Sequence, residues 1–334
     1  MHKIAILTEG SESVGYGHIV RCSIFYDALL NLGNEVEFII KGDSTVGNIL
    51  LNKNFKIYDW QSDLANCIFY LNNFDAIILD SININQKDVN KLCGNNFVLL
   101  TIDDYKRNKY KGAIVLDWTI NLDKNNKHIH NSNDNILLLG LKYAIVRNPF
   151  LIKTNRIPKQ TVENVLLMMG GTDIRGLTNK IMNCILVNFT GVSLHIVANK
   201  NININEEFNK RVFLYSNIDA NELSNVMNIS DVAISAGGQT LYELAAQIIP
   251  TIAIQVTDNQ NEDIIGWVEL GLISEVIDWD DKLIYDKIIQ GLKNINSFEK
   301  REQIYNKVRN QIRNDSVNLI LEVLTKKIND NNRK

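Results

Sequence analysis

The strongest candidate for chemistry in this sequence is a histidine that follows a glycine-rich turn. The segment from Glu9 to His18 reads Glu-Gly-Ser-Glu-Ser-Val-Gly-Tyr-Gly-His and separates an apolar run from an amphipathic stretch. Gly15 and Gly17 allow the backbone conformations and the close approach that a phosphate or a sugar requires. His18 begins the expected helix, where the positive end of the helix dipole disfavours an imidazolium. Because a neutral imidazole accepts a proton, His18 is a candidate for a general base.

The neighbours of this histidine narrow the chemistry. Arg21 lies three residues after His18, near the same helical face, and either orients an anionic ligand or pairs with a surface carboxylate. His18 also has a simpler interpretation, as a residue that caps the helix or packs under the loop. The turn is not a dinucleotide fingerprint, because Val20 occupies the position of its third glycine and no clear acidic residue closes the second strand. A nicotinamide-dependent dehydrogenase is therefore disfavoured.

Two further glycine turns follow apolar runs in the second half of the chain. The first consists of Gly170, Gly171, Thr172 and Asp173, and the second of Gly237, Gly238, Gln239 and Thr240. Backbone N–H groups at such turns bind anions, and we expect a diphosphate at the second turn. Glu243, about one turn into the following helix, is expected to accept hydrogen bonds from ribose hydroxyls. Each turn also fits an ordinary strand-to-helix connection with capping residues.

Other polar side chains follow strand-like runs. Asn259 and Gln260 belong to a polar loop that either lines a ligand cleft together with these glycine turns or caps the next helix. Carboxylates end several of the runs, at Asp80, Asp103, Asp104 and Asp117. Because adjacent strand residues point to opposite faces, we expect these carboxylates to serve turns or caps rather than acid–base chemistry. No cluster has the spacing of a metal site, so no metal is expected.

The elements that must position these residues alternate between β-branched runs and amphipathic stretches, which is typical of βα units around a parallel sheet. The expected strands are 3–7, 35–40, 75–79, 97–102 and 113–116, then 165–169, 194–198, 212–215, 232–235, 251–256 and 274–277. Residues 18–32 predict a helix that ends at Gly33. The residues near one face of this helix are Ile19, Cys22, Phe25, Tyr26 and Leu29. Helices are also expected to begin near residues 177, 220, 239, 261 and 282.

The sequence predicts an α/β protein of two Rossmann-like doubly wound domains that face a cleft. Pro149 and Pro158 flank a polar stretch, which places the boundary between a domain over 1–150 and a domain over 160–328. In doubly wound sheets, ligands bind beyond the carboxyl ends of the strands. The charged stretch over 298–328 has spaced apolar residues and predicts one long amphipathic closing helix for the second domain.

Composition excludes several classes of protein. The 334 residues include 35 Lys and Arg against 38 Asp and Glu, a balance that argues against a nucleic-acid partner. No run approaches the roughly 18 apolar residues of a membrane span, and the first residues lead directly into a strand-like run rather than a signal peptide. We therefore expect a cytoplasmic protein without a membrane partner. The four cysteines lack the spacing of a zinc site or a disulfide framework, and no cofactor is expected.

Four segments, taken together, resemble one family. They are Gly15-x-Gly17-His18-x-x-Arg21, Tyr143-Ala144-Ile145-Val146-Arg147, Met169-Gly170-Gly171-Thr172-Asp173 and Ser235-Ala236-Gly237-Gly238 followed by Glu243. The set spans nearly the whole chain and is similar to the PseG family. These are UDP-2,4-diacetamido-2,4,6-trideoxy-β-L-altropyranose hydrolases of pseudaminic (nonulosonic) acid biosynthesis, related to MurG-like glycosyltransferases. The resemblance implies a GT-B fold in which the second domain holds most of the nucleotide.

The resemblance also implies roles for individual residues. His18 would activate the water that attacks the anomeric carbon, with inversion, release of UDP and no metal. Glu243 and Asn259 match family residues near the nucleotide sugar. The chain departs from the family at Asp80-Ser81-Ile82, where family members often have an Asp-x-Tyr pattern. Two alternatives stay open: an inverting GT-B glycosyltransferase with a UDP-amino-sugar donor, and a nucleotide-sugar binding protein without enzymatic activity.

Overall fold

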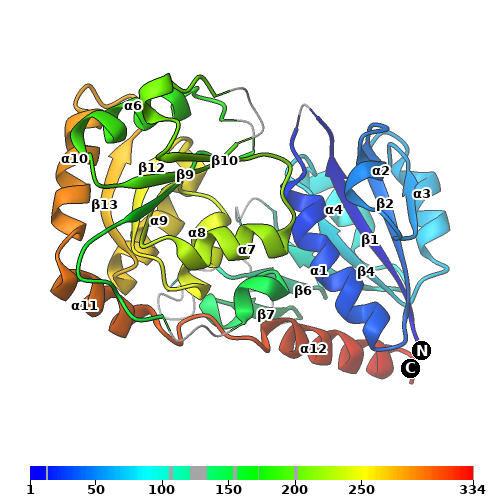
Figure 1. Ribbon diagram of the computed structural model, residues 1–334. Helices are drawn as coiled ribbons and strands as arrows, with labels where there is room; N and C mark the ends of the chain where they lie inside the picture. The colour runs from blue at the N-terminus through cyan, green and yellow to red at the C-terminus, as the bar shows by residue number, and fades with distance from the viewer. Residues whose placement is uncertain are drawn as a thin grey trace. The chain divides into compact units, whose positions relative to one another are not determined.

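A computed structural model describes residues 1–12, 14–104, 108–120, 134–152, 156–171, 173–198 and 202–333 of the chain (Figure 1). The chain forms two compact units. The first consists of Met1–Ile145 together with Asn314–Lys334, and the second of Val146–Arg313. Each unit contains one parallel sheet with helices, as the alternation of runs predicts.

The first unit is built on a seven-stranded parallel sheet with the order β3-β2-β1-β4-β5-β6-β7. Its strands are β1 (Lys3–Gly10), β2 (Glu35–Gly42), β3 (Phe55–Ile57), β4 (Ala76–Asp80), β5 (Val98–Ile102), β6 (Ile114–Asp117) and β7 (Ile136–Leu139). Its helices are α1 (Gly17–Asn31), α2 (Val46–Ile49), α3 (Leu64–Leu71), α4 (Gln86–Leu92), the 3-10 helix η1 (Leu141–Tyr143) and α12 (Ser316–Asn331). The strand order reverses between β1 and β4, and doubly wound sheets bind ligands beyond such a reversal.

Helix α1 forms as its apolar spacing predicts. Its buried residues are the expected Ile19, Cys22, Phe25, Tyr26 and Leu29. This face contacts β1 and β2, and Gly33 follows the helix with a φ of 78°, the left-handed conformation that glycine adopts most readily. The packing of α1 on the sheet places its first turn immediately beyond the carboxyl end of β1.

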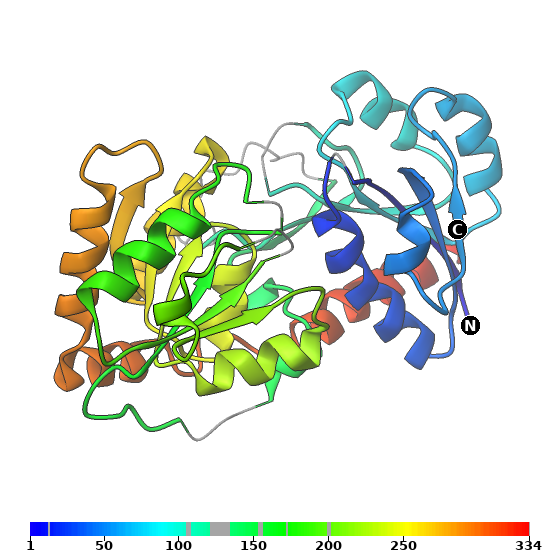
Figure 2. The same ribbon diagram turned by 45° about the horizontal axis from the view of Figure 1, so that its top comes forward.

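The second unit is drawn in green to orange in Figure 2. It is built on a six-stranded parallel sheet with the order β10-β9-β8-β11-β12-β13. Its strands are β8 (Asn164–Met168), β9 (Ser193–Val197), β10 (Val212–Tyr215), β11 (Val232–Ala236), β12 (Thr251–Gln255) and β13 (Ile273–Asp278). Its helices are η2 (Asn148–Leu151), α6 (Thr178–Asn188), η3 (Glu206–Phe208), α7 (Ala220–Ile229), α8 (Thr240–Ala246), η4 (Asp258–Gln260), α9 (Asn261–Leu270), α10 (Ile284–Ile295) and α11 (Phe298–Val308). Helices α6 and α10 share one apolar core with the sheet, and the order of strands reverses between β8 and β11.

All eleven expected strands are present, and the described residues contain two further strands that the sequence pattern does not predict, β3 and β7. Strand β3 has three residues and β7 has four, and most of their side chains are only partly buried or exposed. A short strand with one half-buried face carries a weak apolar signal, so these two edge positions were not visible in the sequence pattern.

The closing segment differs from the single helix expected for the second domain. Helix α11 ends at Val308, and Asn310 adopts a positive φ of 75°. Helix α12 belongs to the first unit, where it contacts α1 and β5. Its buried residues are Ser316, Ile320, Leu321, Leu324 and Ile328. The apolar spacing therefore serves two separate cores, because the chain leaves the helical conformation between Val308 and Ser316.

A buried histidine should make the second unit less stable in mild acid. The two ring nitrogens of His195 on β9 each lie 3.0 Å from a partner, Tyr215 Oη and Asn164 Oδ1. Burial lowers the pKa of His195 from its ordinary value of 6.5, although the charge of Asp231 opposes this shift. The unfolded chain therefore binds a proton that the folded chain disfavours. Neutral His195 therefore contributes fully to the free energy of unfolding above the pKa of the unfolded chain, and this contribution is lost as the pH falls below that pKa.

Urea unfolding at several pH values tests this expectation. We expect the free energy of unfolding to decrease between about pH 7.5 and about pH 5.5, and a His195→Gln variant to lose that part of the decrease. An identical pH dependence in the variant and the wild type would contradict it.

Candidate functional site

The glycine-histidine loop lies beyond the carboxyl end of β1. Gly15 N donates to Ser11 O over 2.8 Å, which forms a backbone bridge across the loop. Gly15 has a φ of 90°, a conformation that explains the glycine at this position. Gly17 begins α1, so His18 lies in the first helical turn at the reversal between β1 and β4.

His18 is hydrogen-bonded to a carboxylate at the end of the neighbouring strand. Its Nδ1 lies 2.8 Å from Oδ1 of Asp80, the last residue of β4. Burial raises the pKa of Asp80, but the charges of Arg21 and His18 and their hydrogen bonds outweigh burial and lower it. The carboxylate is therefore ionised and can only accept, so Nδ1 of His18 carries the proton of this bond. No described residue hydrogen-bonds Nε2, which leaves that nitrogen as the basic one.

Arg21 connects the two carboxylates of this site. Its Nε and Nη2 donate to Asp80 Oδ2 and Oδ1 over 2.6 and 2.5 Å, and its Nη1 donates to Asp104 Oδ2 over 2.6 Å. Burial lowers the pKa of Arg21, but the two carboxylates outweigh burial and raise it well above its ordinary value. Nη2 also lies 3.1 Å from His18 Nδ1, a contact between two donors rather than a hydrogen bond. Arg21 therefore pairs with carboxylates, but its partner Asp80 is buried and is not the surface carboxylate expected. The orientation of an anionic ligand by Arg21 stays a prediction.

The expected turn or cap roles are wrong for Asp80 and Asp104. The expectation fits Asp117, whose Oδ1 accepts from Thr119 N over 3.0 Å. Asp80, however, ends β4, and Asp104 lies just beyond β5, the adjacent parallel strand, so that both carboxylates reach Arg21 in the first turns of α1. The reversal in strand order, which the sequence does not display, brings them to one guanidinium.

Glu9 is a buried carboxylate that holds the loop after β4. Its side chain accepts the N–H groups of Ile82 and Asn83 at Oε1, over 2.5 and 3.1 Å. Oε1 also accepts from Ser81 Oγ over 3.0 Å. Oε2 accepts from Asn83 Nδ2 and Gln61 Nε2, each over 3.1 Å. One carboxylate therefore fixes the chain that directly follows the last residue of β4.

Replacing Glu9 with glutamine should destabilise the first unit. An amide NH₂ would face N–H groups that now meet carboxylate oxygens, at a cost of about 2–4 kcal/mol in the free energy of unfolding. Urea denaturation measures this loss. Glu12→Gln changes an exposed residue of the loop that follows β1 and should be nearly neutral. Equal stability of the two variants would show that the Glu9 network contributes nothing.

The loop after β8 uses its acidic residue as a helix cap. The carboxylate of Asp173 accepts the N–H groups of Leu177 and Thr178 at the start of α6, each over 3.0 Å. Asp173 has a positive φ of 41°, and Gly170 has a φ of 82°. Gly170 and Gly171 are exposed, so they provide the accessible backbone of this turn.

The turn after β11 is closely packed against the next loop. A Cβ atom on Gly237 would lie 2.4 Å from Cδ1 of Ile264 and 3.2 Å from Oε1 of Gln260. The same Oε1 accepts from Val256 N over 3.0 Å. Gln260 therefore joins the end of β12 to the β11 turn, which continues into α8 through Gly238, Gln239 and Thr240.

Glu243 of α8 forms an ion pair with Arg147. Arg147 Nε and Nη2 donate to Oε1 and Oε2 of Glu243 over 2.6 and 2.9 Å, and Glu243 is buried. Spacing alone did not predict this pair, because its two residues are 96 positions apart. Each carboxylate oxygen keeps a second lone pair, so the pair can still accept a hydroxyl group.

The predicted site residues fall into two groups, one in each unit. In the first unit the structure brings together Gly15, Gly17, His18 and Arg21. In the second unit, the turns and helix starts that follow the neighbouring strands β8, β11 and β12 contain Gly170, Gly171, Asp173, Gly237, Gly238, Gln239, Thr240, Glu243 and Gln260. Thr172 lies outside the described residues, and of Asn259 only the backbone, in η4, is described.

The part of the chain that the structure describes shows neither a metal-binding cluster nor a membrane-spanning helix. Within it, no three His, Cys, Asp or Glu side chains are grouped to hold a metal ion. No helix within the same ranges has both the length and the apolar character needed to cross a membrane.

Comparison with known proteins gives distant relatives. No family model matches the chain. It is 26% identical over 279 residues to an uncharacterized protein of Methanocaldococcus jannaschii. The matched region covers 78% of this chain and 57% of that protein. The chain is 28% identical over 267 residues to the pseudaminic acid cytidylyltransferase and UDP-2,4-diacetamido-2,4,6-trideoxy-beta-L-altropyranose hydrolase of Helicobacter pylori, covering 77% of this chain and 45% of that protein. The chain spans about half the length of these curated relatives.

Solved structures resemble the whole chain. MurG of Acinetobacter baumannii superposes with a TM-score of 0.66 at 11% identity, covering 98% of this chain and 100% of MurG. MnaA of Staphylococcus aureus, solved with UDP, gives 0.66 at 13% identity, covering 98% of this chain and 97% of MnaA. WaaG, a glycosyltransferase involved in lipopolysaccharide biosynthesis, gives 0.56 at 12% identity, covering 96% and 99%. These likenesses, with the two parallel sheets, confirm the predicted GT-B fold.

Proposed function

We propose that this chain hydrolyses UDP-2,4-diacetamido-2,4,6-trideoxy-β-L-altropyranose to the free amino sugar and UDP, a step of pseudaminic acid biosynthesis. The observation that carries the proposal is the 2.8 Å hydrogen bond between His18 Nδ1 and Asp80 Oδ1. It fixes the imidazole in one tautomer and leaves Nε2 to accept a proton. The name of the Helicobacter pylori relative supports the substrate, and the fold shared with MnaA, solved with UDP, supports the nucleotide.

In the proposed reaction, water attacks the anomeric carbon while His18 Nε2 takes its proton. A new carbon–oxygen bond forms to water, the bond from the anomeric carbon to the diphosphate breaks, and the bonding electrons leave with UDP. Attack opposite the leaving group inverts the anomeric configuration. The Asp80 carboxylate stabilises the imidazolium that forms, and the proton then passes to solvent.

The second unit would hold the nucleotide. Backbone N–H groups at the turns that follow β8 and β11 suit the diphosphate, and they stabilise the charge that develops on the leaving oxygen. Glu243, held by Arg147, would accept the ribose hydroxyls through its remaining lone pairs. Asp173 caps α6, so we propose that it shapes its turn rather than contacting the ligand.

An inverting glycosyltransferase is the second candidate, and the likeness to WaaG and MurG favours it. The same base would then deprotonate a sugar hydroxyl in place of water. The two functions differ in what they require, because only the transferase needs an acceptor.

Incubation of the purified full chain with the UDP-sugar and no acceptor separates the two functions. We expect stoichiometric free sugar and UDP, with the inverted anomer visible by NMR before mutarotation. No turnover until an acceptor is supplied would overturn the hydrolase proposal in favour of the transferase. UDP binding without turnover under either condition would leave a binding protein.

Activity should not depend on a divalent metal. No step of the proposed mechanism uses one, because His18 activates the water and backbone amides face the diphosphate. We expect the rate of UDP release to be unchanged by an excess of EDTA. A rate that EDTA abolishes and Mg²⁺ restores would contradict this mechanism.

A further inference from the structure

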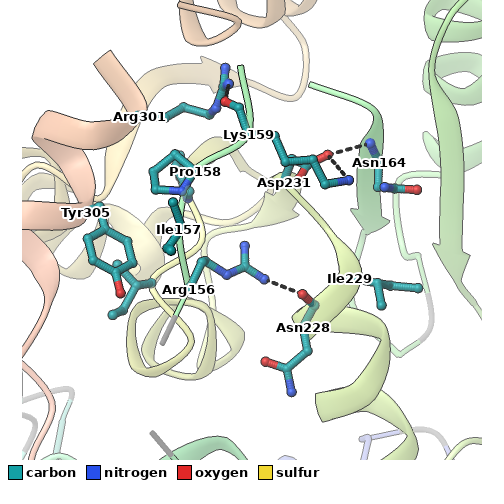
Figure 3. A pocket seen from close by; sticks show the side chains of 12 residues that line it. Arg156, Ile157, Pro158, Lys159, Asn164, Asn228, Ile229, Asp231, Arg301 and Tyr305 are labelled. Carbon is teal, nitrogen blue, oxygen red and sulfur yellow. Dashed lines mark hydrogen bonds and ion pairs between the residues drawn. The ribbon is translucent and has the colours of Figure 1, made fainter. Parts of the chain in front are cut away.

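A pocket of about 540 Å³ lies in the second unit, at the amino ends of its strands (Figure 3). Its lining includes Asn164, which begins β8, and Asp231, which directly precedes β11. Because the sheet is parallel, this edge is opposite the glycine turns that follow β8 and β11. The volume falls within the range of about 300–1,000 Å³ that small-molecule sites occupy.

The walls of this pocket combine apolar surface with cationic side chains. The apolar surface comes from Ile157, Pro158, Ile229, Ile248, Pro250 and Tyr305. Arg156, Lys159 and Arg301 provide the positive charge, and Asp231 is the one carboxylate among the lining residues. Asp231 Oδ2 already accepts two backbone N–H groups, over 2.9 and 2.8 Å, and lies 3.7 Å from Lys159 Nζ.

Among the described residues, the two guanidinium groups donate only to main-chain oxygens. Arg156 donates to three carbonyl groups at the end of α7, over 2.5 to 2.9 Å. Arg301 donates to Ile295 O over 2.8 Å and to Lys159 O over 2.5 Å. Neither arginine forms an ion pair with a carboxylate of the described residues. Burial lowers the pKa of both arginines, although the charge of Asp231 opposes this shift, so both carry a desolvation cost.

Of the two arginines, Arg301 is the one whose contacts helix capping does not fully explain. Its side chain is 2% exposed, and its Nε–H has no acceptor among the described residues. Helix capping accounts for the contacts of Arg156 with the end of α7 and of Arg301 with the end of α10, since cations are favourable at the C-terminus of a helix. It does not account for a buried N–H without a partner beside an open pocket, because such a group is costly unless a ligand or water satisfies it.

We propose that this pocket binds a small organic anion, a carboxylate or phosphate attached to a compact apolar group. The acidic oxygens would meet Arg301 and Lys159, where charge-assisted bonds to a guanidinium are strongest. The apolar part would cover the surface formed by Ile229, Pro250 and Tyr305. The site is separate from the proposed nucleotide loops, so UDP should not compete for it.

Calorimetric titration of the full chain with benzoate and with phenyl phosphate tests this proposal. We expect saturable binding of at least one of them with or without saturating UDP. The preferred one identifies the acidic group. Benzyl alcohol lacks the charge and inorganic phosphate lacks the apolar group, so both should bind at least about tenfold more weakly.

Three variants locate the binding. Arg301→Met and Lys159→Met should each weaken binding of the preferred probe by about tenfold. Arg211→Met is the matched control, because the described partners of Arg211 are also main-chain carbonyl groups, at the end of α6 and beyond it, but Arg211 lies outside the pocket. It should lose stability and keep its affinity. If Arg301→Met fails to fold, the affinity of Lys159→Met still tests whether the probe binds in this pocket, because Lys159 is half-exposed.

Three results would overturn the proposal. They are no saturable binding of either probe at millimolar concentrations, displacement of the probe by UDP, and a Lys159→Met affinity equal to that of Arg211→Met. Displacement by UDP would place the probe at the nucleotide loops instead.

Discussion

His18→Ala should lower the turnover of the UDP-sugar by about a thousandfold or more while the affinity for UDP stays unchanged. The imidazole is the one group of the first-unit site that we assign to proton transfer. Its removal leaves water without a base, although the turns of the second unit remain. The expected split is therefore a loss in kcat with little change in UDP binding, measured by UDP release and by calorimetry.

A matched control is available in the same unit. His2 also lies beside an aspartate, with its Nδ1 3.8 Å from Asp75 Oδ2, but it precedes β1 at the opposite end of the strand. His2→Ala should keep wild-type turnover. If His18→Ala also keeps it, His18 is not the base, and a loss of UDP affinity in that variant would assign it to binding instead.

Local features of the sequence predicted most of the fold. The apolar runs located the strands, and the spacing of Ile19, Cys22, Phe25, Tyr26 and Leu29 identified the buried face of α1. The prediction of a single closing helix for the second domain is wrong, because apolar spacing indicates that a helix face is buried but not which core buries it. The break between Val308 and Ser316 separates α11 of the second unit from α12 of the first unit.

The candidate site was predictable only where it is local. The glycine turns and His18 were visible because their signals lie within a few residues of one another. The partners of these residues were not: His18 and Asp80 are 62 positions apart, and Arg21 and Asp104 are 83 positions apart. Such pairs follow from the order of strands in a sheet, and one sequence does not reveal that order. The strand-end carboxylates were seen, but their shared partner was not.

Asp80→Asn should lower turnover by about 10³- to 10⁴-fold, because an amide can place an NH₂ group opposite His18 Nδ1. Nδ1 would then become the acceptor, and the proton would move to Nε2, the nitrogen that must be free to take a proton from water. The pKa of Asp80 lies below its ordinary range, so the carboxylate is already ionised at neutral pH. The loss should therefore be a large fall in kcat with the UDP affinity retained, and it should not be recovered by raising the pH.

Asp104→Asn separates this effect from the loss of an ion pair. Both variants remove a carboxylate from Arg21, but only Asp80 also contacts His18. Thermal unfolding of both proteins measures the structural part of each change. If tautomer control is the role of Asp80, turnover falls far more in Asp80→Asn than in Asp104→Asn even where the two are equally stable. Equal turnover in the two variants would mean that Asp80 acts only by holding Arg21, and that the orientation of His18 has another source.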